Sequence, residues 1–228
     1  MRVLCVIPVR GGSKGIPGKN RRMVAGKPLL VWTIEQALAS HQNLDVLVST
    51  DDEQLALLAR EAGATVPFIR PAELAQDSTA TEPVILHAID FQSKLGLRPD
   101  AVMLLQATSP IRLSDTIDRA VEQFATEDVD SLVGVVPQTP FLWQMGPAPV
   151  AHYEVDARPR RQDLGAGDFF YRETGSLYLT KTEIYETRNN RIGGKIGLFV
   201  MDEIEGIDID TPTDLLVAEH ILLSQQQI

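Results

Sequence analysis

The chain has 228 residues, near the upper end of what one α/β domain holds around a single core. Its 44% hydrophobic and 23% charged residues are ordinary globular values and exclude wholesale disorder. Its one cysteine, Cys5, excludes a disulfide framework and a multi-cysteine zinc site. No apolar run approaches the roughly 20 residues of a membrane span, and no signal peptide is evident. We therefore expect a cytoplasmic protein that does not bind membranes.

The charge of the chain is distributed unevenly. Residues 1–34 carry seven Lys and Arg residues and no Asp or Glu, so this segment has a charge of +7 and the rest of the chain −17. A general nucleic-acid binder is expected to be basic more widely, whereas a nucleoside triphosphate needs only one local basic site. The pattern favours a small polyanionic ligand and no nucleic-acid partner; the alternative is a solvated basic loop.

Apolar runs and helical spacing alternate through the first 136 residues. Five runs predict strands buried on both faces, and these are residues 2–9, 45–50, 66–70, 101–106 and 131–136. Apolar residues at helical spacing predict four helices between them, with Asp51 and Ser114 as caps for two of these. This alternation predicts an α/β fold with an open, mostly parallel sheet and helices on both faces.

The alternation stops between Pro137 and Arg172, where five prolines interrupt the chain. We expect a single domain over residues 1–228 with an insertion at about 138–172, an arm over the site or a partner subunit; the alternative is a long surface loop. Strands are expected again at 175–180 and 195–201. The last helix is expected to start at Thr211-Pro212-Thr213-Asp214, which combines an N-cap, a first-turn proline and an acid.

A glycine-rich basic segment, residues 10–20 (RGGSKGIPGKN), follows the first strand. Its four glycines let backbone N–H groups approach phosphate oxygens, while Arg10, Lys14 and Lys19 supply positive charge. The segment is not a P-loop, because that signature requires glycine in place of Ser13 and a hydroxyl residue in place of Asn20. It lacks the spacing G-x-G-x-x-G as well. We expect a phosphate-binding turn at the carboxyl end of the first strand.

Two aspartates, Asp208 and Asp210, stand two residues apart near the end of the chain. If this segment is extended, both carboxylates point the same way, and a cation between them relieves their repulsion. Mg²⁺ held by one or two carboxylates and substrate phosphates fits this arrangement. The alternative is that Asp210 only precedes the last helix while Asp208 is solvated. The basic segment and the aspartates together suggest two sides of one metal–triphosphate site.

Polar residues follow other predicted strands. Arg70 and Gln106 interrupt apolar runs at the expected rim of the sheet and are candidates for ligand contact, as is Ser109. The alternative for each is helix capping. None of the four histidines has an arrangement that indicates catalysis.

Several motifs resemble one known family. The motifs are IPVRGGSKGIPGKN (7–20), GKPL (26–29), STD (49–51), RPAELA (70–75), LLQATSPIR (104–112) and IDIDTPTD (207–214). They span nearly the whole chain and are similar to those of the acylneuraminate cytidylyltransferases. The resemblance implies a Rossmann-like nucleotidyltransferase fold and a homodimer with a swapped dimerisation arm. It also implies transfer of CMP from CTP to a nonulosonic (sialic-type) acid, with Mg²⁺ and release of pyrophosphate.

The resemblance also implies roles for individual residues. Those that would hold CTP are Arg10, Gly11, Gly12, Ser13, Lys14, Lys19, Asn20, Arg70 and Ser78. Those that would contact the acceptor sugar are Gln106, Ser109, Arg161 and Gln162, the last two from the arm of the neighbouring subunit. Asp208 and Asp210 would bind the metal and, with Lys19 and Arg10, form the catalytic set.

The chain departs from the family pattern in three places. Ala107 stands where proline is common, Thr174 stands where asparagine is common, and residues 140–145 lack a lysine that some members have. The last two departures bear on which sugar is used rather than on CTP. A Kdo-type CMP-sugar synthetase, a glycosyltransferase with a metal-binding D-I-D and a catalytically silent nucleotide-sugar-binding protein are the alternatives.

Overall fold

The computed structural model describes residues 1–12 and 15–225. A six-stranded sheet forms its centre, in the order β10-β6-β9-β5-β1-β4. The strands of this sheet are β1 (Val3–Pro8), β4 (Leu44–Ser49), β5 (Ala101–Leu105), β6 (Ser131–Gln138), β9 (Phe170–Lys181) and β10 (Ile196–Val200). Two short hairpins are formed by β2 (Met23–Val24) with β3 (Lys27–Pro28) and by β7 (Trp143–Gln144) with β8 (Val150–Ala151).

The sheet is mixed and mainly parallel. Strand β1 pairs in parallel with β4 and β5, and β10 pairs in parallel with β6. Strand β9 lies antiparallel between β5 and β6, with a register shift between Val133 and Val135. The expected parallel α/β sheet is therefore confirmed in outline, with one reversed strand. That strand is reversed because it returns from the insertion that follows β6.

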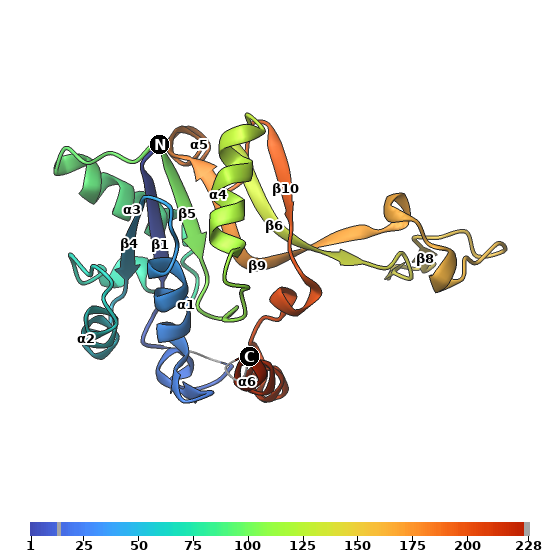
Figure 1. Ribbon diagram of the computed structural model, residues 1–228, viewed down its shortest axis with the longest axis horizontal. Coiled ribbons are helices and arrows are strands. Elements are labelled where there is room, and N and C mark those ends of the chain that lie inside the picture. The colour runs from blue at the N-terminus through green and yellow to red at the C-terminus, as the bar shows by residue number, and fades with distance from the viewer. Residues whose placement is uncertain (13–14, 226–228) are drawn as a thin grey trace.

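Helices cover both faces of the sheet (Figure 1). One face packs on α1 (Leu29–Leu38), α2 (Glu53–Glu61) and α4 (Thr116–Thr126). The other face packs on α3 (Thr81–Lys94) and α5 (Thr182–Arg188). The last helix, α6 (Pro212–Gln225), packs beside the 15–25 segment at the carboxyl end of β1. Among the described residues, no helix is long and apolar enough to cross a bilayer.

Three local predictions are wrong. Residues 66–70 are not a strand, since only a bridge between Leu47 and Thr65 forms and Pro67 has no N–H to continue a ladder. The cap of α2 is Asp52, whose carboxylate accepts from the N–H groups of residues 54 and 55, because Asp51 instead accepts from Gly11 N. The residue at the N-cap of α4 is Asp115, one residue after Ser114.

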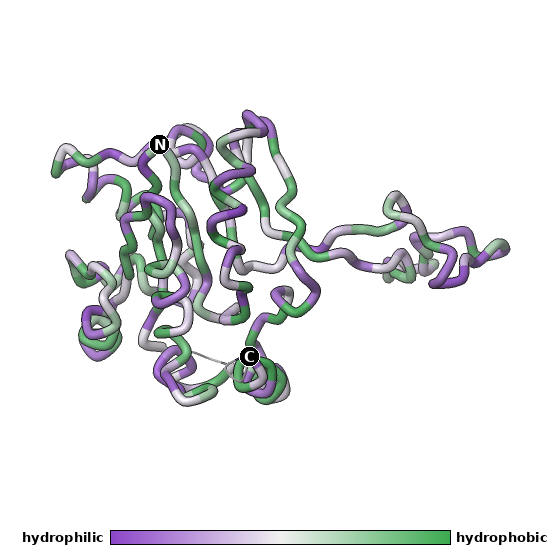
Figure 2. The backbone as a smooth tube through the Cα atoms, in the orientation of Figure 1, coloured by the Kyte–Doolittle hydropathy of each residue, from purple (hydrophilic) through white to green (hydrophobic). Residues whose placement is uncertain are grey.

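The insertion forms an arm, residues 139–169, that projects sideways from the body (Figure 1). It starts where β6 leaves the sheet and returns through β9. The body strands are hydrophobic over most of their length, whereas the arm alternates between hydrophobic and hydrophilic residues (Figure 2). A small aromatic cluster joins Phe141, Trp143 and Tyr153, with the Arg158 guanidinium over two of the rings.

Candidate active site

A cavity of about 420 Å³ opens at the carboxyl ends of β1 and β5. Three parts of the chain form its walls: the segment after β1, the 70–84 segment with the start of α3, and the loop after β5. Asp210 closes the cavity next to the first of these walls. The carboxyl end of an open α/β sheet is where such folds bind ligands, so this cavity is the candidate site.

The segment after β1 turns sharply and brings Lys19 and Asn20 to the cavity wall. Gly18, with φ of +63°, precedes the short helix Lys19–Arg21, and this left-handed conformation favours glycine. The buried Asn20 donates from Nδ2 to the carbonyl of Arg10 at 3.3 Å, which closes the turn. Arg10, Lys19 and Asn20 all line the cavity, as expected from the sequence.

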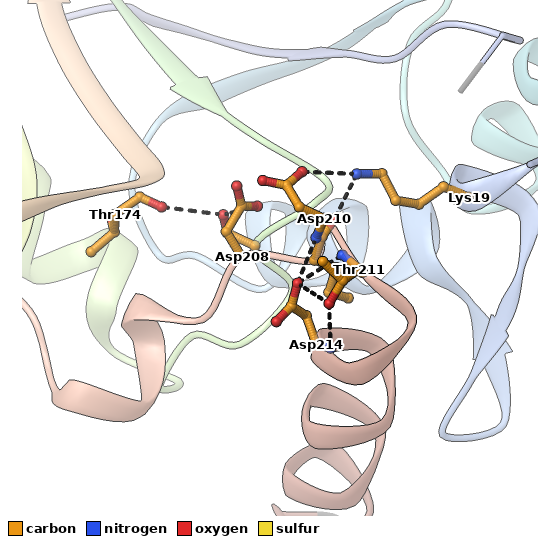
Figure 3. A network of polar contacts seen from close by, with 8 residues as sticks. Lys19, Thr174, Asp208, Asp210, Thr211 and Asp214 are labelled. Atoms are coloured by element: carbon orange, nitrogen blue, oxygen red, sulfur yellow. Dashed lines mark hydrogen bonds and ion pairs between the residues drawn. The ribbon is translucent and has the colours of Figure 1, made fainter. Parts of the chain in front are cut away.

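Lys19 connects the segment after β1 with the segment before α6 (Figure 3). Its Nζ donates to the carbonyl of Ile209 at 2.5 Å and lies 3.5 Å from Oδ1 of Asp210. A Cβ on Gly15 would approach the carbonyl of Asp210 to 2.9 Å, so the backbone of the glycine-rich segment also meets the aspartates closely. The basic segment and the aspartates are therefore spatial neighbours at one cavity.

The segment that carries Asp208 and Asp210 is anchored at the residue between them. Ile209 is fully buried and donates its N–H to the carbonyl of Thr108 at 2.8 Å. Both aspartates accordingly face away from the core, and Figure 3 shows their carboxylates on the same side. Asp208 accepts from Ser109 Oγ at 3.2 Å, whereas the side chain of Asp210 is 76% exposed.

Asp214, in the first turn of α6, fixes the backbone that carries Asp210 and Thr211. The carboxylate of Asp214 accepts from the N–H of Asp210 and from both the N–H and the hydroxyl of Thr211. Hydrogen bonds from Thr211 and Asp210 lower the pKa of Asp214. The expected capped start of α6 is confirmed, and the cap also fixes the backbone beside the candidate metal ligands.

Two arginines, Arg70 and Arg10, line the cavity. Arg70 is buried, donates to the carbonyl of Val9 and lies 3.6 Å from Asp51. Burial lowers the pKa of Arg70, while Asp51 raises it and Arg10 lowers it further. Arg10 is paired at 2.8 Å with Asp77. Both arginines are thus held by acids beside the cavity.

Gln106 projects from the end of β5 into the cavity wall. Its Oε1 lies 2.6 Å from where a Cβ on Gly175 would stand, and Gly175 has φ of +71°. The left-handed backbone therefore favours glycine at 175, and a larger residue there would displace the end of the Gln106 side chain. The departure at Thr174 lies in the body rather than the arm: its buried hydroxyl donates to the carbonyl of Gly134.

The predicted site residues divide into three groups. Those lining the cavity are Arg10, Lys19, Asn20, Arg70, Gln106 and Asp210. Those beside the cavity or its walls but not lining it are Gly11, Gly12, Ser78, Ser109 and Asp208. Arg161 and Gln162 lie on the arm and are exposed. The predicted ligands Ser13 and Lys14 lie outside the described residues.

Several cavity residues were missed from the sequence, and these are Gln76, Asp77, Thr79, Thr81 and Thr108. Four of them lie in the 71–81 segment, whose composition indicated only a loop. The signal available was its position, because a loop that leads from an expected strand, here 66–70, into the following helix lies at the carboxyl edge of a parallel sheet.

The donor chemistry of the site fits Mg²⁺ only if a substrate completes the coordination. Within residues 1–12 and 15–225, no three Asp, Glu, His or Cys side chains come together as a metal site. Two carboxylates beside a cationic wall leave the remaining positions to phosphate oxygens and water, which is the arrangement typical of Mg²⁺. Asp208 and Asp210 are the residues that would hold it.

An open α/β sheet with cations and carboxylates around a cavity at its carboxyl edge defines a class of protein that binds phosphorylated ligands. The chain belongs to the cytidylyltransferase family, whose model matches residues 4–221. This confirms the resemblance found in the sequence motifs.

Curated relatives agree with this assignment. The chain is 34% identical to the CMP-N,N'-diacetyllegionaminic acid synthase of Legionella pneumophila, covering 100% of this chain and 99% of that protein. It is 36% identical to the N-acylneuraminate cytidylyltransferase A of Danio rerio over 97% of this chain and 51% of that protein. A solved CMP:2-keto-3-deoxy-manno-octonic acid synthetase complexed with CTP matches with a TM-score of 0.72 at 16% identity, covering 100% of both chains, which supports the fold.

Proposed function

We propose that the protein transfers CMP from CTP to a nonulosonic acid, a nine-carbon α-keto acid sugar, and releases pyrophosphate. The anomeric hydroxyl oxygen bonds to the α-phosphorus, the bond from that phosphorus to the bridging oxygen of pyrophosphate breaks, and the hydroxyl proton is lost. The proposal rests on one observation: Lys19 and Asp210 form an ion pair at a cavity that Arg10 also lines.

The residues of the glycine-rich segment act on the phosphates. Lys19 and Arg10 supply positive charge where negative charge grows on the leaving pyrophosphate, and Asn20 keeps the turn closed through the Arg10 carbonyl. On the arrival of a triphosphate, Arg10 exchanges Asp77 for a phosphate oxygen. Such an in-line transfer needs positioning and charge neutralisation rather than a covalent intermediate on the protein.

The carboxylates of Asp208 and Asp210 would hold Mg²⁺ together with the phosphates of CTP. When bound, Mg²⁺ would neutralise phosphate charge and make the acceptor hydroxyl more acidic. Ser109 orients Asp208 through its hydroxyl, and Asp214 holds the backbone of Asp210.

Arg70 and Ser78 belong to the cytidine side of the proposed complex, and Gln106 faces the acceptor sugar. Arg161 and Gln162 lie on the arm and do not line the cavity of their own chain. We assign them to the cavity of a second copy in a homodimer, where Arg161 pairs with the sugar carboxylate.

The test incubates the protein with CTP, Mg²⁺ and a panel of acids: legionaminic, pseudaminic, sialic, deaminated sialic and Kdo. Pyrophosphate and the CMP-sugar are both measured. We expect product with one or more nine-carbon acids and little with Kdo. Product with Kdo alone would assign the eight-carbon acid, and no turnover with any acid at saturating CTP would contradict the proposal. The Asp210→Ala variant, which should retain the fold, is expected to lose turnover by orders of magnitude.

A further inference from the structure

Arg112 ends the LLQATSPIR motif yet does not line the cavity. It is only 4% exposed and spans three elements of the body. Nη1 donates to Thr33 Oγ1 at 3.3 Å and to Gln36 Oε1 at 2.9 Å, both on α1. Nη2 donates to two carbonyls, those of Gln106 at 3.1 Å and Ser176 at 2.8 Å. One guanidinium thus ties α1 to the end of β5 and to β9.

This guanidinium is a buried cation held by neutral oxygens. Within the described residues, no carboxylate lies at ion-pair distance from Arg112. Burial lowers the pKa of Arg112 to about 10, so it remains charged at neutral pH. A buried charge is costly unless hydrogen bonds compensate it. The four hydrogen bonds therefore hold Arg112 in one position, and with it the carbonyls that it contacts.

The loop that Arg112 holds also carries the aspartate segment. The carbonyl of Thr108 accepts from Ile209 N at 2.8 Å, and Ser109 Oγ donates to Asp208 at 3.2 Å. Gln36 supports the same loop by donating from Nε2 to the carbonyl of Pro110 at 2.7 Å. Contacts therefore run from Arg112 through residues 106–110 to Asp208 and to the N–H of Ile209, the residue next to Asp210.

We propose that Arg112 is a positioning residue for cytidylyl transfer: by holding the 106–110 loop it fixes where Asp208 and Asp210 stand relative to Lys19. The inference rests on the proposed function, in which these aspartates hold the metal. Arg112 itself touches neither the nucleotide nor the sugar.

The test compares Arg112→Lys and Gln36→Leu with a control, Ile34→Val, which trims a fully buried apolar residue of α1 that makes no side-chain hydrogen bond. Lysine keeps the charge but cannot reach both carbonyls with a planar fork. Because Gln36 is half-buried on α1, its variant is expected to fold even if the arginine variant does not. Each variant is measured for thermal unfolding, for hydrogen exchange of the 207–211 segment, and for the Mg²⁺ dependence of turnover.

Both test variants are expected to exchange faster at 207–211, where Ile209 N donates to the loop. They should need at least about fivefold more Mg²⁺ for half-maximal turnover and lose about 10- to 100-fold in kcat, with the KM for CTP changed by less than about threefold. The control should match wild type in exchange and in Mg²⁺ dependence.

Variants that lose thermal stability but keep wild-type exchange at 207–211 and wild-type Mg²⁺ dependence would overturn the inference and leave Arg112 a structural residue. Failure of the proposed function is distinguishable, because the wild-type protein itself would then give no CMP-sugar while the exchange experiment still reports on the loop.

Discussion

The body and the arm differ in how much of their apolar surface is covered. All of β5 is buried, and so is all of β1 except Pro8. From residue 141 to residue 173, by contrast, no residue is buried, and Trp143 and Met145 are 52% and 81% exposed. The body therefore has a fully covered core within one chain, whereas the arm is held by a small aromatic cluster around Tyr153 and leaves apolar side chains uncovered.

The two regions also differ in which substrate their residues are proposed to bind. The groups assigned to the triphosphate, Lys19, Arg10 and Asp210, meet inside the body. The arm residues assigned to the acceptor sugar, Arg161 and Gln162, do not line that cavity. Changes in the triphosphate groups of the body should lower turnover with every acceptor, and changes in the arm should affect mainly the use of the acceptor.

The largest effect is expected from Lys19→Ala in the body. Loss of the ammonium between the phosphates and Asp210 should lower kcat by about 100- to 1,000-fold, the usual cost of one charge-stabilising donor. The matched control is Lys27→Ala, which removes a lysine paired with Glu35 and stacked over Trp32 outside the cavity. Pyrophosphate release measures both. Equal activity of the two variants would remove Lys19 from the site.

A smaller effect is expected from Arg161→Ala in the arm. Loss of a charged hydrogen bond to the sugar carboxylate should raise the KM for the acid by about 10- to 100-fold while the KM for CTP stays near wild type. Initial rates over a matrix of both substrates measure this. A rise in the KM for CTP instead would place Arg161 at the nucleotide.

The swapped arm adds a second outcome to this comparison. Co-expression of Lys19→Ala with Arg161→Ala should restore about a quarter of wild-type activity, because half of the dimers are hybrids and each hybrid has one intact site. Each variant expressed alone is the control. The absence of rescue in dimers shown to be mixed would contradict an arm acting across subunits.

The boundary between the two regions can be tested at Gly175. In Gly175→Ala the new Cβ would lie 2.6 Å from Gln106 Oε1 and displace it, in addition to straining a left-handed backbone. Gly96→Ala is the control, since Gly96 has φ of +75° with nothing within 4 Å of the added Cβ. Both should lose about 1 kcal/mol of stability. Only Gly175→Ala should lose about tenfold in kcat/KM for the acid; equal kinetics would remove Gln106 from the acceptor side.

The smallest effect concerns the core of the body at alkaline pH. Burial raises the pKa of the Cys5 thiol from 9.0 to about 12. The unfolded chain therefore releases this proton first, so the stability contribution is complete below pH 9 and is lost as pH rises toward 12. Urea unfolding should show wild type losing about 1.4 kcal/mol more than Cys5→Ala between pH 8 and pH 10. If the free energy of unfolding changed equally with pH in the two proteins, the Cys5 thiol would have the same pKa in the folded and the unfolded chain, and the prediction would be wrong.

Local patterns predicted the elements that lie inside the body. The apolar run at residues 2–9 became β1 because both of its faces are covered, and the Thr211–Asp214 motif became the start of α6 because its acid satisfies free N–H groups. The 66–70 run failed because apolar composition does not distinguish a strand from a buried loop once Pro67 removes a ladder donor.

The site was predicted in part for the same reason. Glycines with cations, and aspartates two apart, have a local chemistry that spacing reveals, so the sequence predicts Lys19 and Asp210 as site residues, and the structure brings the two to one cavity. Asp77 and Thr108 have no local signature, and only their position across the cavity gives them a role. The interaction of Arg112 with the carbonyls of Gln106 and Ser176 also has no sequence signal, because a carbonyl belongs to every residue.

By itself, the sequence determined the α/β alternation, the basic and glycine-rich character of residues 10–20 and the family, because these depend on side-chain order along the chain. Only the tertiary structure decided that Lys19 meets Asp210 and Ile209, which follows it by 190 residues, and that the arm projects sideways from the body without lining the cavity of its own chain. The physical reason is that burial patterns specify which face of an element is covered, whereas the order and direction of strands in the sheet decide which ends become neighbours.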